Sequence, residues 1–148
     1  MFLRRPDSHL GLANFMRSHL YASLATLKIG LDILLKEEDV KIDSITGHGG
    51  LFKTKGVGQS ILAAAMNAPI SVMETAGEGG AWGMALLAAY MLFKKDGQSL
   101  GDYLDSRVFA ERKSETMEPD LADVAGFETY TKQYQACLAA EKAAVQAF

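Results

Sequence analysis

The stretch Ser44–Val72 reads SITGHGGLFKTKGVGQSILAAAMNAPISV and decides the fold. It holds five of the chain's fourteen glycines, followed by an apolar helical pattern and a proline. A short β-prone run leads into the glycines, and residues 57–66 then predict a helix. Asn67 is a candidate C-terminal cap, and Pro69 enforces the end of that helix. Residues 69–74, PISVME, predict a second strand, so the order strand, loop, helix, strand indicates an α/β core.

Helices are predicted on both sides of this core. Apolar residues recur at spacings of three and four over residues 14–36, which predicts an amphipathic helix. The recurring residues are Leu12, Met16, Leu20, Leu24, Leu27, Leu31 and Leu34. Asn14 or Ser8 could cap its start. Residues 80–93 and 120–148 predict two more helices, rich in alanine.

Between those last two helices the pattern is weaker. Residues 94–104, KKDGQSLGDYL, predict a turn and a helix start, with Ser99 as a candidate cap. Residues 114–120, SETMEPD, are polar and predict a loop.

Two or three short strands make a poor sheet alone, since sheets usually carry about five or six. We therefore expect a helix-rich α/β chain that forms a single partial domain over residues 1–148, whose sheet belongs to something larger or is completed by a partner. Its core is expected at residues 10–95, with a helical tail at 96–148.

Composition narrows the class of protein. The 148 residues are 49% hydrophobic and 22% charged, which is ordinary for a globular chain. A formal net charge of −3 argues against a nucleic-acid binder, which needs a basic face. Cys137 is the only cysteine, so no internal disulfide can form. The apolar run at residues 81–93 is too short to span a bilayer, and the first ten residues lack a signal-peptide core. We expect a cytoplasmic protein without membrane or nucleic-acid partners.

The glycine stretch suggests anion chemistry. Glycines between a strand and a helix let backbone N–H groups approach a phosphate, and Lys53 and Lys55 could add positive charge. The spacing is neither a Walker A loop nor a dinucleotide fingerprint, because Phe52 stands where the latter needs glycine. His48 could touch a phosphate or merely end the strand. The alternative is a tight turn in which glycine only supplies a positive φ.

Other candidate groups favour structural roles. His9 and His19 have no companion ligands for a metal, and we expect no metal site or catalytic group in this chain. Glu74 and Glu78 suit a helix start. Trp82, Met84 and Met91 are expected to pack in a core. Cys137 is expected to be an unactivated thiol.

Two segments carry a resemblance to a known family. GGLFKTKGVGQSILAAAMNAPI, from Gly49 to Ile70, resembles the adenosine motif of the FGGY carbohydrate kinases with ribulokinase-like spacing. ETAGEGGAWGMALLAA resembles the family's Glu-x-x-Ala-x-Gly-Ala-Ala helix, with Glu78, Ala81, Gly83 and Ala85 in place. LGLANFMRSHLYASLATL is similar to the family's Gly-Leu-Thr segment and its long helix. Together these motifs cover most of residues 10–93.

The resemblance implies a portion of a ribonuclease H-like domain, the fold of actin, hexokinase and Hsp70-type ATPases. It implies ATP with Mg²⁺ as cofactor and a sugar, such as ribulose or xylulose, as substrate. Carried onto this chain, the nucleotide contacts are Gly49, Gly50 and Leu51, with Thr54 facing the base and Lys53 beside them. A homodimer stays open.

The chain departs from the family pattern in places. Lys55 stands where ribulokinase-like sequences tend to have Asn, and Ala64 replaces a frequent Asp. The catalytic Asp, sugar contacts and phosphate loop of the family lie upstream of these motifs, and no segment here matches them. We expect the chain to be a kinase fragment or a split-gene product, inactive alone. The alternative is a non-catalytic α/β interaction module.

Overall fold

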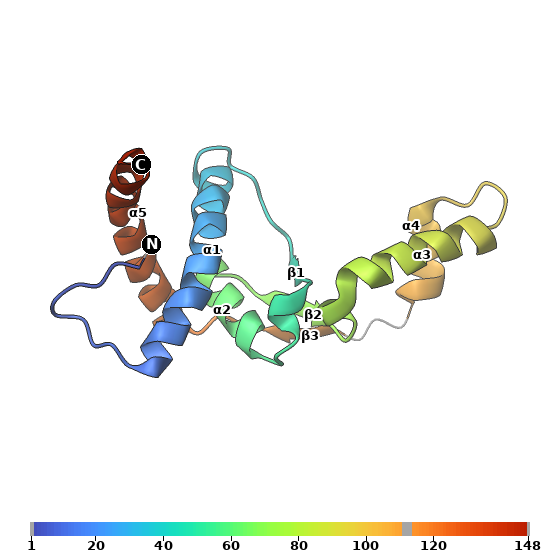
Figure 1. The fold of residues 1–148 in the computed structure, drawn as a ribbon. Coiled ribbons are helices and arrows are strands. Elements are labelled where there is room, and N and C mark those ends of the chain that lie inside the picture. Colours follow the sequence, from blue (N-terminus) through green and yellow to red (C-terminus); the bar gives the residue numbers. More distant parts are fainter. Residues whose placement is uncertain (1, 111–113, 148) are drawn as a thin grey trace. The chain divides into compact units, whose positions relative to one another are not determined.

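The computed structural model describes residues 2–110 and 114–147. It contains five α-helices and a three-stranded sheet among those residues (Figure 1). Two compact units divide the chain. One holds residues 1–43, 60–68 and 118–148, and the other holds residues 44–59 and 69–117. This architecture confirms the predicted helix-rich α/β class.

The first unit is built on two long helices, α1 (Leu12–Lys36) and α5 (Leu121–Gln146). Tyr21 of α1 packs its ring against Phe127 of α5, with centroids 4.8 Å apart, and against Tyr130 at 5.2 Å. Phe127 is fully buried, and Leu24 and Ala25 lie in the same core. The last residues of α2 (Val57–Met66) add the buried side chains Leu62 to Met66 to this unit. The final helix therefore closes its own unit.

Helix α1 confirms the predicted helix but buries only part of its apolar pattern. Leu24 of that pattern is buried together with Tyr21, Ala25 and Lys28, while Leu12, Met16, Leu27 and Leu34 are exposed. The predicted caps of this helix are wrong. Gly11 takes the N-cap position without a side-chain bond, because Asn14 donates instead to the carbonyl oxygen of His9.

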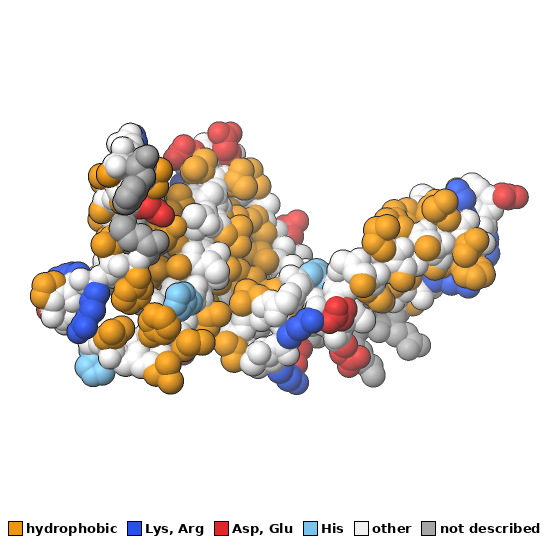
Figure 2. Space-filling view, in the orientation of Figure 1, with side chains coloured by type: hydrophobic (Ala, Val, Ile, Leu, Met, Phe, Trp, Pro, Cys, Tyr) orange, Lys and Arg blue, Asp and Glu red, His pale blue; other side chains and the backbone are white. Residues whose placement is uncertain are grey.

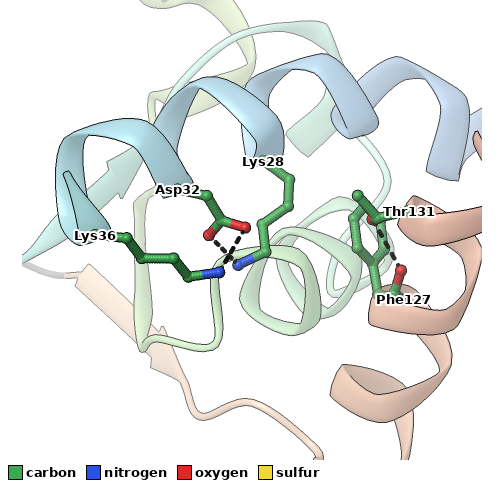
Figure 3. A network of polar contacts seen from close by, with 5 residues as sticks. All are labelled: Lys28, Asp32, Lys36, Phe127 and Thr131. Carbon is green, nitrogen blue, oxygen red and sulfur yellow. Dashed lines mark hydrogen bonds and ion pairs between the residues drawn. The ribbon is translucent and has the colours of Figure 1, made fainter. Parts of the chain in front are cut away.

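A charged cluster lies along α1 beside α5 (Figure 3). Lys28, which is 9% exposed, donates to Asp32 at 2.7 Å, and Lys36 donates to the other oxygen of Asp32 at 3.1 Å. Burial alone would raise the pKa of Asp32, but hydrogen bonds and charge from Lys28 and Lys36 outweigh it and hold the pKa below its ordinary value. On α5, Thr131 donates to the carbonyl oxygen of Phe127.

The second unit is built on a mixed sheet in the order β1 (Ile45–Gly47), β2 (Ile70–Met73), β3 (Ser114–Met117). Strands β1 and β2 are parallel, with Ile45 opposite Ile70. They are joined by a connection that contains α2, as parallel strands require. At the end of α2, Asn67 adopts a positive φ of 49°, as suits a C-terminal cap.

Strand β3 was not expected, because residues 114–120 predict a polar loop. Residues 114–117 instead pair antiparallel with β2, Ile70 opposite Met117 and Met73 opposite Ser114. Three of the four residues of β3 are exposed, so no apolar alternation marks the strand. Contacts with β2 and with Gln59 hold these residues in a strand. Buried Gln59 donates both to the carbonyl oxygen of Ile70 and to that of Glu115, at 2.7 and 2.8 Å, and so ties β2 to β3.

Helix α3 (Gly79–Phe93) and the short α4 (Leu100–Tyr103) complete this unit. Tyr90 stacks edge-on against Tyr103 and donates to the carbonyl oxygen of Gln98 at 2.8 Å. Ser99 caps α4 by accepting from the N–H of Asp102, as predicted. A π-helical turn, Leu104–Val108, follows α4.

The predicted core packing of two methionines on α3 is wrong. Met84 is 68% and Met91 77% exposed, although Trp82 does pack against Phe109 with ring centroids 5.9 Å apart. No residue of α3 is buried: Phe109 and Tyr103 cover Trp82 and Tyr90 only in part, and the side of the helix that carries Met84 and Met91 stays exposed. Hydrophobic side chains accordingly gather on the surface along α3 (Figure 2).

Phe127→Ala is expected to lower the free energy of unfolding by about 3–5 kcal/mol, because it removes a fully buried ring from the α1–α5 interface. Leu121→Ala, on the same helix but 78% exposed, is the control and should change it by less than about 0.5 kcal/mol. Urea unfolding followed by circular dichroism measures both. Equal effects of the two substitutions would contradict the proposed core.

Asp32 should make stability fall in acid. A carboxyl with a depressed folded pKa stabilises fully above its ordinary pKa of 3.8 and loses that contribution as the pH falls through the folded value. Asp32→Asn should therefore destabilise the chain at pH 7 and flatten the fall in stability below about pH 4. Urea unfolding between pH 2 and pH 7 checks this, with the exposed Asp96→Asn as control. An unchanged pH profile in Asp32→Asn would show that the pair contributes nothing.

Candidate functional site

Two loops meet at one edge of the sheet in the second unit. The glycine loop (residues 48–56) follows β1, and the second loop (residues 74–78) follows β2. Because β1 and β2 are parallel, their carboxyl ends lie at the same edge, where ligands of open α/β sheets bind. The two motifs that the sequence singled out are thereby brought together.

Gly49 connects the two loops through its backbone. Its φ is 108°, which favours glycine, and its N–H donates to the carbonyl oxygen of Ala76 at 2.7 Å. Ala76 is almost completely buried, so this bond is a fixed point of the site. The N–H of Gly49 is therefore engaged within the protein and is not the group that would meet an anion.

Two glycines of the second motif let the loops approach closely. A Cβ on Gly77 would lie 3.2 Å from Cγ of Lys53, and a Cβ on Gly79 would lie 3.3 Å from Cβ and Nδ1 of His48. His48 is exposed and lies against the first residue of α3. Its contact with Gly79 accounts for its place in the loop without a ligand.

The lysines predicted to attract an anion are both paired with carboxylates. Lys53 contacts Glu78 at 2.6 Å, and Lys55 contacts Glu115 at 3.1 Å. The hydrogen bond and the positive charge of Lys53 hold the pKa of Glu78 below its ordinary value. No local sequence pattern predicts either pairing, and Glu115 lies in a strand whose polar composition predicts a loop.

Gly50 begins a 3₁₀ turn, Gly50–Phe52, and differs from its neighbours. It is exposed, its φ is not positive, and no protein atom lies within 4 Å of the position a Cβ would take. Leu51 is half-buried, and Thr54 is exposed close by along the chain. Neither packing nor backbone conformation requires glycine at position 50.

Beside the glycine loop lies a cleft of about 410 Å³. Its walls come from the glycine loop, α2, the end of β2 and the start of β3. The lining residues are Phe52, Lys55, Gln59, Val72, Met73, Glu74, Ser114 and Glu115. The volume lies at the small end of the range for small-molecule sites. Sequence reasoning missed Gln59, although an amide on the first turn of a largely apolar helix is a signal that could have found it.

The remaining candidates lie elsewhere. His9 and His19 both line a larger, open cavity of about 850 Å³ in the first unit, between residues 2–10, α1 and α5. Cys137 also lines it and is an exposed free thiol. Within residues 2–110 and 114–147, no three His, Cys, Asp or Glu side chains gather as a metal site requires. None of the described helices is both long and apolar enough to cross a membrane.

The comparisons with known proteins bear on the two loops. The sequence model for the C-terminal domain of the FGGY family of carbohydrate kinases matches residues 2–92, which include both loops and all of the parallel strand pair. The chain belongs to the FGGY family of carbohydrate kinases. Kinases of this family phosphorylate sugars and generally use ATP and Mg²⁺. Searches of curated proteins and of solved structures gave no match.

Gly58→Ala is expected to disturb the glycine loop. Its Cβ would collide with the backbone carbonyl of Leu51 and lie 2.8 Å from that residue's Cγ, so the loop or α2 must shift. We expect a loss of about 1–3 kcal/mol in the free energy of unfolding, as for overpacked sites. Gly50→Ala is the matched control and should change it by less than about 0.5 kcal/mol. Thermal and urea unfolding measure both, and equal stability of the two variants would contradict the described loop.

Proposed function

We propose that this chain is the nucleotide-binding portion of an ATP-dependent kinase that phosphorylates a hydroxyl of a ketose or polyol. A pentulose such as ribulose or xylulose is the proposed substrate. The family match supports the kinase class, and the ribulokinase-like spacing from Gly49 to Ile70 supports the pentulose. Such a kinase takes ATP and releases ADP. We also propose a cytoplasmic location for it.

The observation that carries the proposal is the bare surface at Gly50. A glycine that the fold does not need, exposed at the carboxyl edge of a parallel strand pair, leaves room for an external group to approach the backbone. In the proposed complex, the ribose and α-phosphate lie over Gly49 and Gly50. Leu51 forms a wall for the adenine, and Thr54 faces the base.

The described residues suit the adenosine half of ATP better than its phosphates. Both lysines near the loop are already paired with carboxylates, so the edge carries little unbalanced positive charge. The cleft beside Phe52 adds an aromatic ring and carboxylates next to the loop, which favour a neutral polar group over a phosphate. Mg²⁺ would supply charge neutralisation at the phosphates, and we propose that residues outside this chain hold it.

Phosphoryl transfer further needs a base for the sugar hydroxyl and donors on the transferred phosphate. We propose that a second polypeptide region provides these groups together with the sugar site. The isolated chain would then bind nucleotide weakly and not turn over.

One observation favours a second candidate, a non-catalytic interaction module. Helix α3 exposes an apolar surface (Figure 2), formed by Met84, Leu87, Met91, Leu92 and Phe93, which are between 45% and 77% exposed. Exposed apolar surfaces of this kind commonly mark contacts with other proteins. In that case the glycines would be turns and nucleotide would have no effect.

Binding of nucleotide to the full 148-residue chain separates the two. We expect ADP with Mg²⁺ at millimolar concentration to raise the melting temperature slightly, because a ligand that binds only the folded state stabilises it. Gly50→Leu should abolish that rise by filling the bare surface. Gly126→Leu is the matched control, because Gly126 is also exposed with no atom within 4 Å of its Cβ position. It should leave the shift unchanged.

An absent shift in the unaltered chain, confirmed by calorimetric titration, would favour the interaction module. A shift that survives in Gly50→Leu would place nucleotide elsewhere. A coupled assay for ADP formation with ribulose or xylulose tests the remaining part. Turnover by this chain alone at ordinary kinase rates would contradict the need for a second region.

A further inference from the structure

Lys53 and Glu78 form an ion pair between the glycine loop and the second loop. The Nζ–Oε1 distance is 2.6 Å, and both side chains are largely exposed, at 59% and 73%. Exposed pairs of this kind add little to global stability. Such a pair can still hold two segments in one relative position, and this one joins the two loops that follow β1 and β2 at one edge of the sheet.

Three further contacts surround the pair. The N–H of Gly49 donates to the carbonyl oxygen of Ala76, the stem of Lys53 lies over Gly77, and His48 lies over Gly79. The glycines at 77 and 79 give Lys53 and His48 the room to lie against the second loop. These contacts hold the two loops close together, and the side chain of Lys53 extends over Gly77 to Glu78.

We propose that Lys53 is a positioning residue, which sets the glycine loop through Glu78 and does not contact the nucleotide phosphates. The Lys53–Glu78 pair, called the loop latch below, fixes the position of Gly49 and Gly50 relative to the second loop. This role rests on the proposed nucleotide function. It assigns Lys53 differently from the sequence pattern, in which a lysine beside glycines suggests a phosphate ligand.

The two roles predict different effects of substitution on the binding of adenosine and of ATP. A phosphate ligand contributes only to ATP, so Lys53→Met would weaken ATP and leave adenosine unchanged. A positioning residue contributes to both, so Lys53→Met weakens both by the same factor, about two- to fivefold for an exposed pair. Glu78→Gln discriminates further. It frees Lys53 and strengthens ATP binding if Lys53 is a phosphate ligand, but weakens both ligands if the latch holds.

Calorimetric or NMR titration of the full chain with adenosine and with Mg·ATP tests the latch. Lys53→Arg should restore most of the affinity, and the exchanged pair Lys53→Glu with Glu78→Lys should recover part of it. Lys36→Met is the control, because Lys36 is also an exposed lysine in an ion pair but lies on α1. It should leave both affinities unchanged. Loss of ATP affinity alone, or no change in either affinity, overturns the proposal.

The rate of hydrogen exchange at the Gly49 amide tests the loop latch without any ligand. That amide donates to Ala76 across the two loops, so its exchange should be about two- to fivefold faster in Lys53→Met and in Glu78→Gln, and slower again in Lys53→Arg. If the unaltered chain binds neither adenosine nor ATP, the proposed function fails and this exchange decides the latch alone. Unchanged exchange in both variants then overturns it.

Discussion

The parallel pairing of β1 with β2 is the constraint on which the candidate site depends. Three residue pairs, from Ile45 opposite Ile70 to Gly47 opposite Val72, bring the ends of two distant motifs to one edge. Such a short pairing needs support, and Ile70, fully buried in the central strand, provides it together with Gln59. The amide of Gln59 binds β2 to β3, so an edge strand without an apolar signal becomes part of the same platform.

The glycines in the loop and at its two ends serve different physical purposes. A side chain at position 47 would overlap the ring of Phe52, and one at position 58 would meet the backbone of Leu51. Gly49 needs its positive φ, and its N–H is taken by Ala76. After these requirements of the fold are removed, Gly50 alone of the loop's first glycines has no internal reason to be glycine. Gly50 is therefore the position at which a ligand could account for the glycine.

Much of the fold could be predicted, because apolar periodicity marks helices and because proline, asparagine and serine mark their ends. The helix at 57–66, its end at Asn67 and the following strand come from such signals, and Ser99 caps α4 as expected. Strand β3 could not be predicted, since its only reason to extend is the edge of β2.

The same limit applies to side chains. Lys55 was interpreted alone, whereas its partner Glu115 is sixty residues away in sequence. Met84 and Met91 were placed in a core because apolar composition indicates burial, but composition does not say which surface does the burying. The two motifs meet at one edge of the sheet, whereas the charges around them depend on long-range pairing that no local pattern reveals.

Under the proposed function, those charges favour one half of a nucleotide over the other. A phosphate site needs unpaired donors or net positive charge, because the desolvation of an anion must be compensated. Here Lys53 and Lys55 are paired with Glu78 and Glu115, and the N–H of Gly49 is already bonded. What remains is a bare glycine backbone beside a small cleft with an aromatic wall, which is why the proposed ligand is the sugar ring and flat base of adenosine. A two-part kinase has room for such a division, since the charged, reacting end of ATP must meet the sugar and the catalytic base in any case, and only the adenosine end can be held apart from the chemistry.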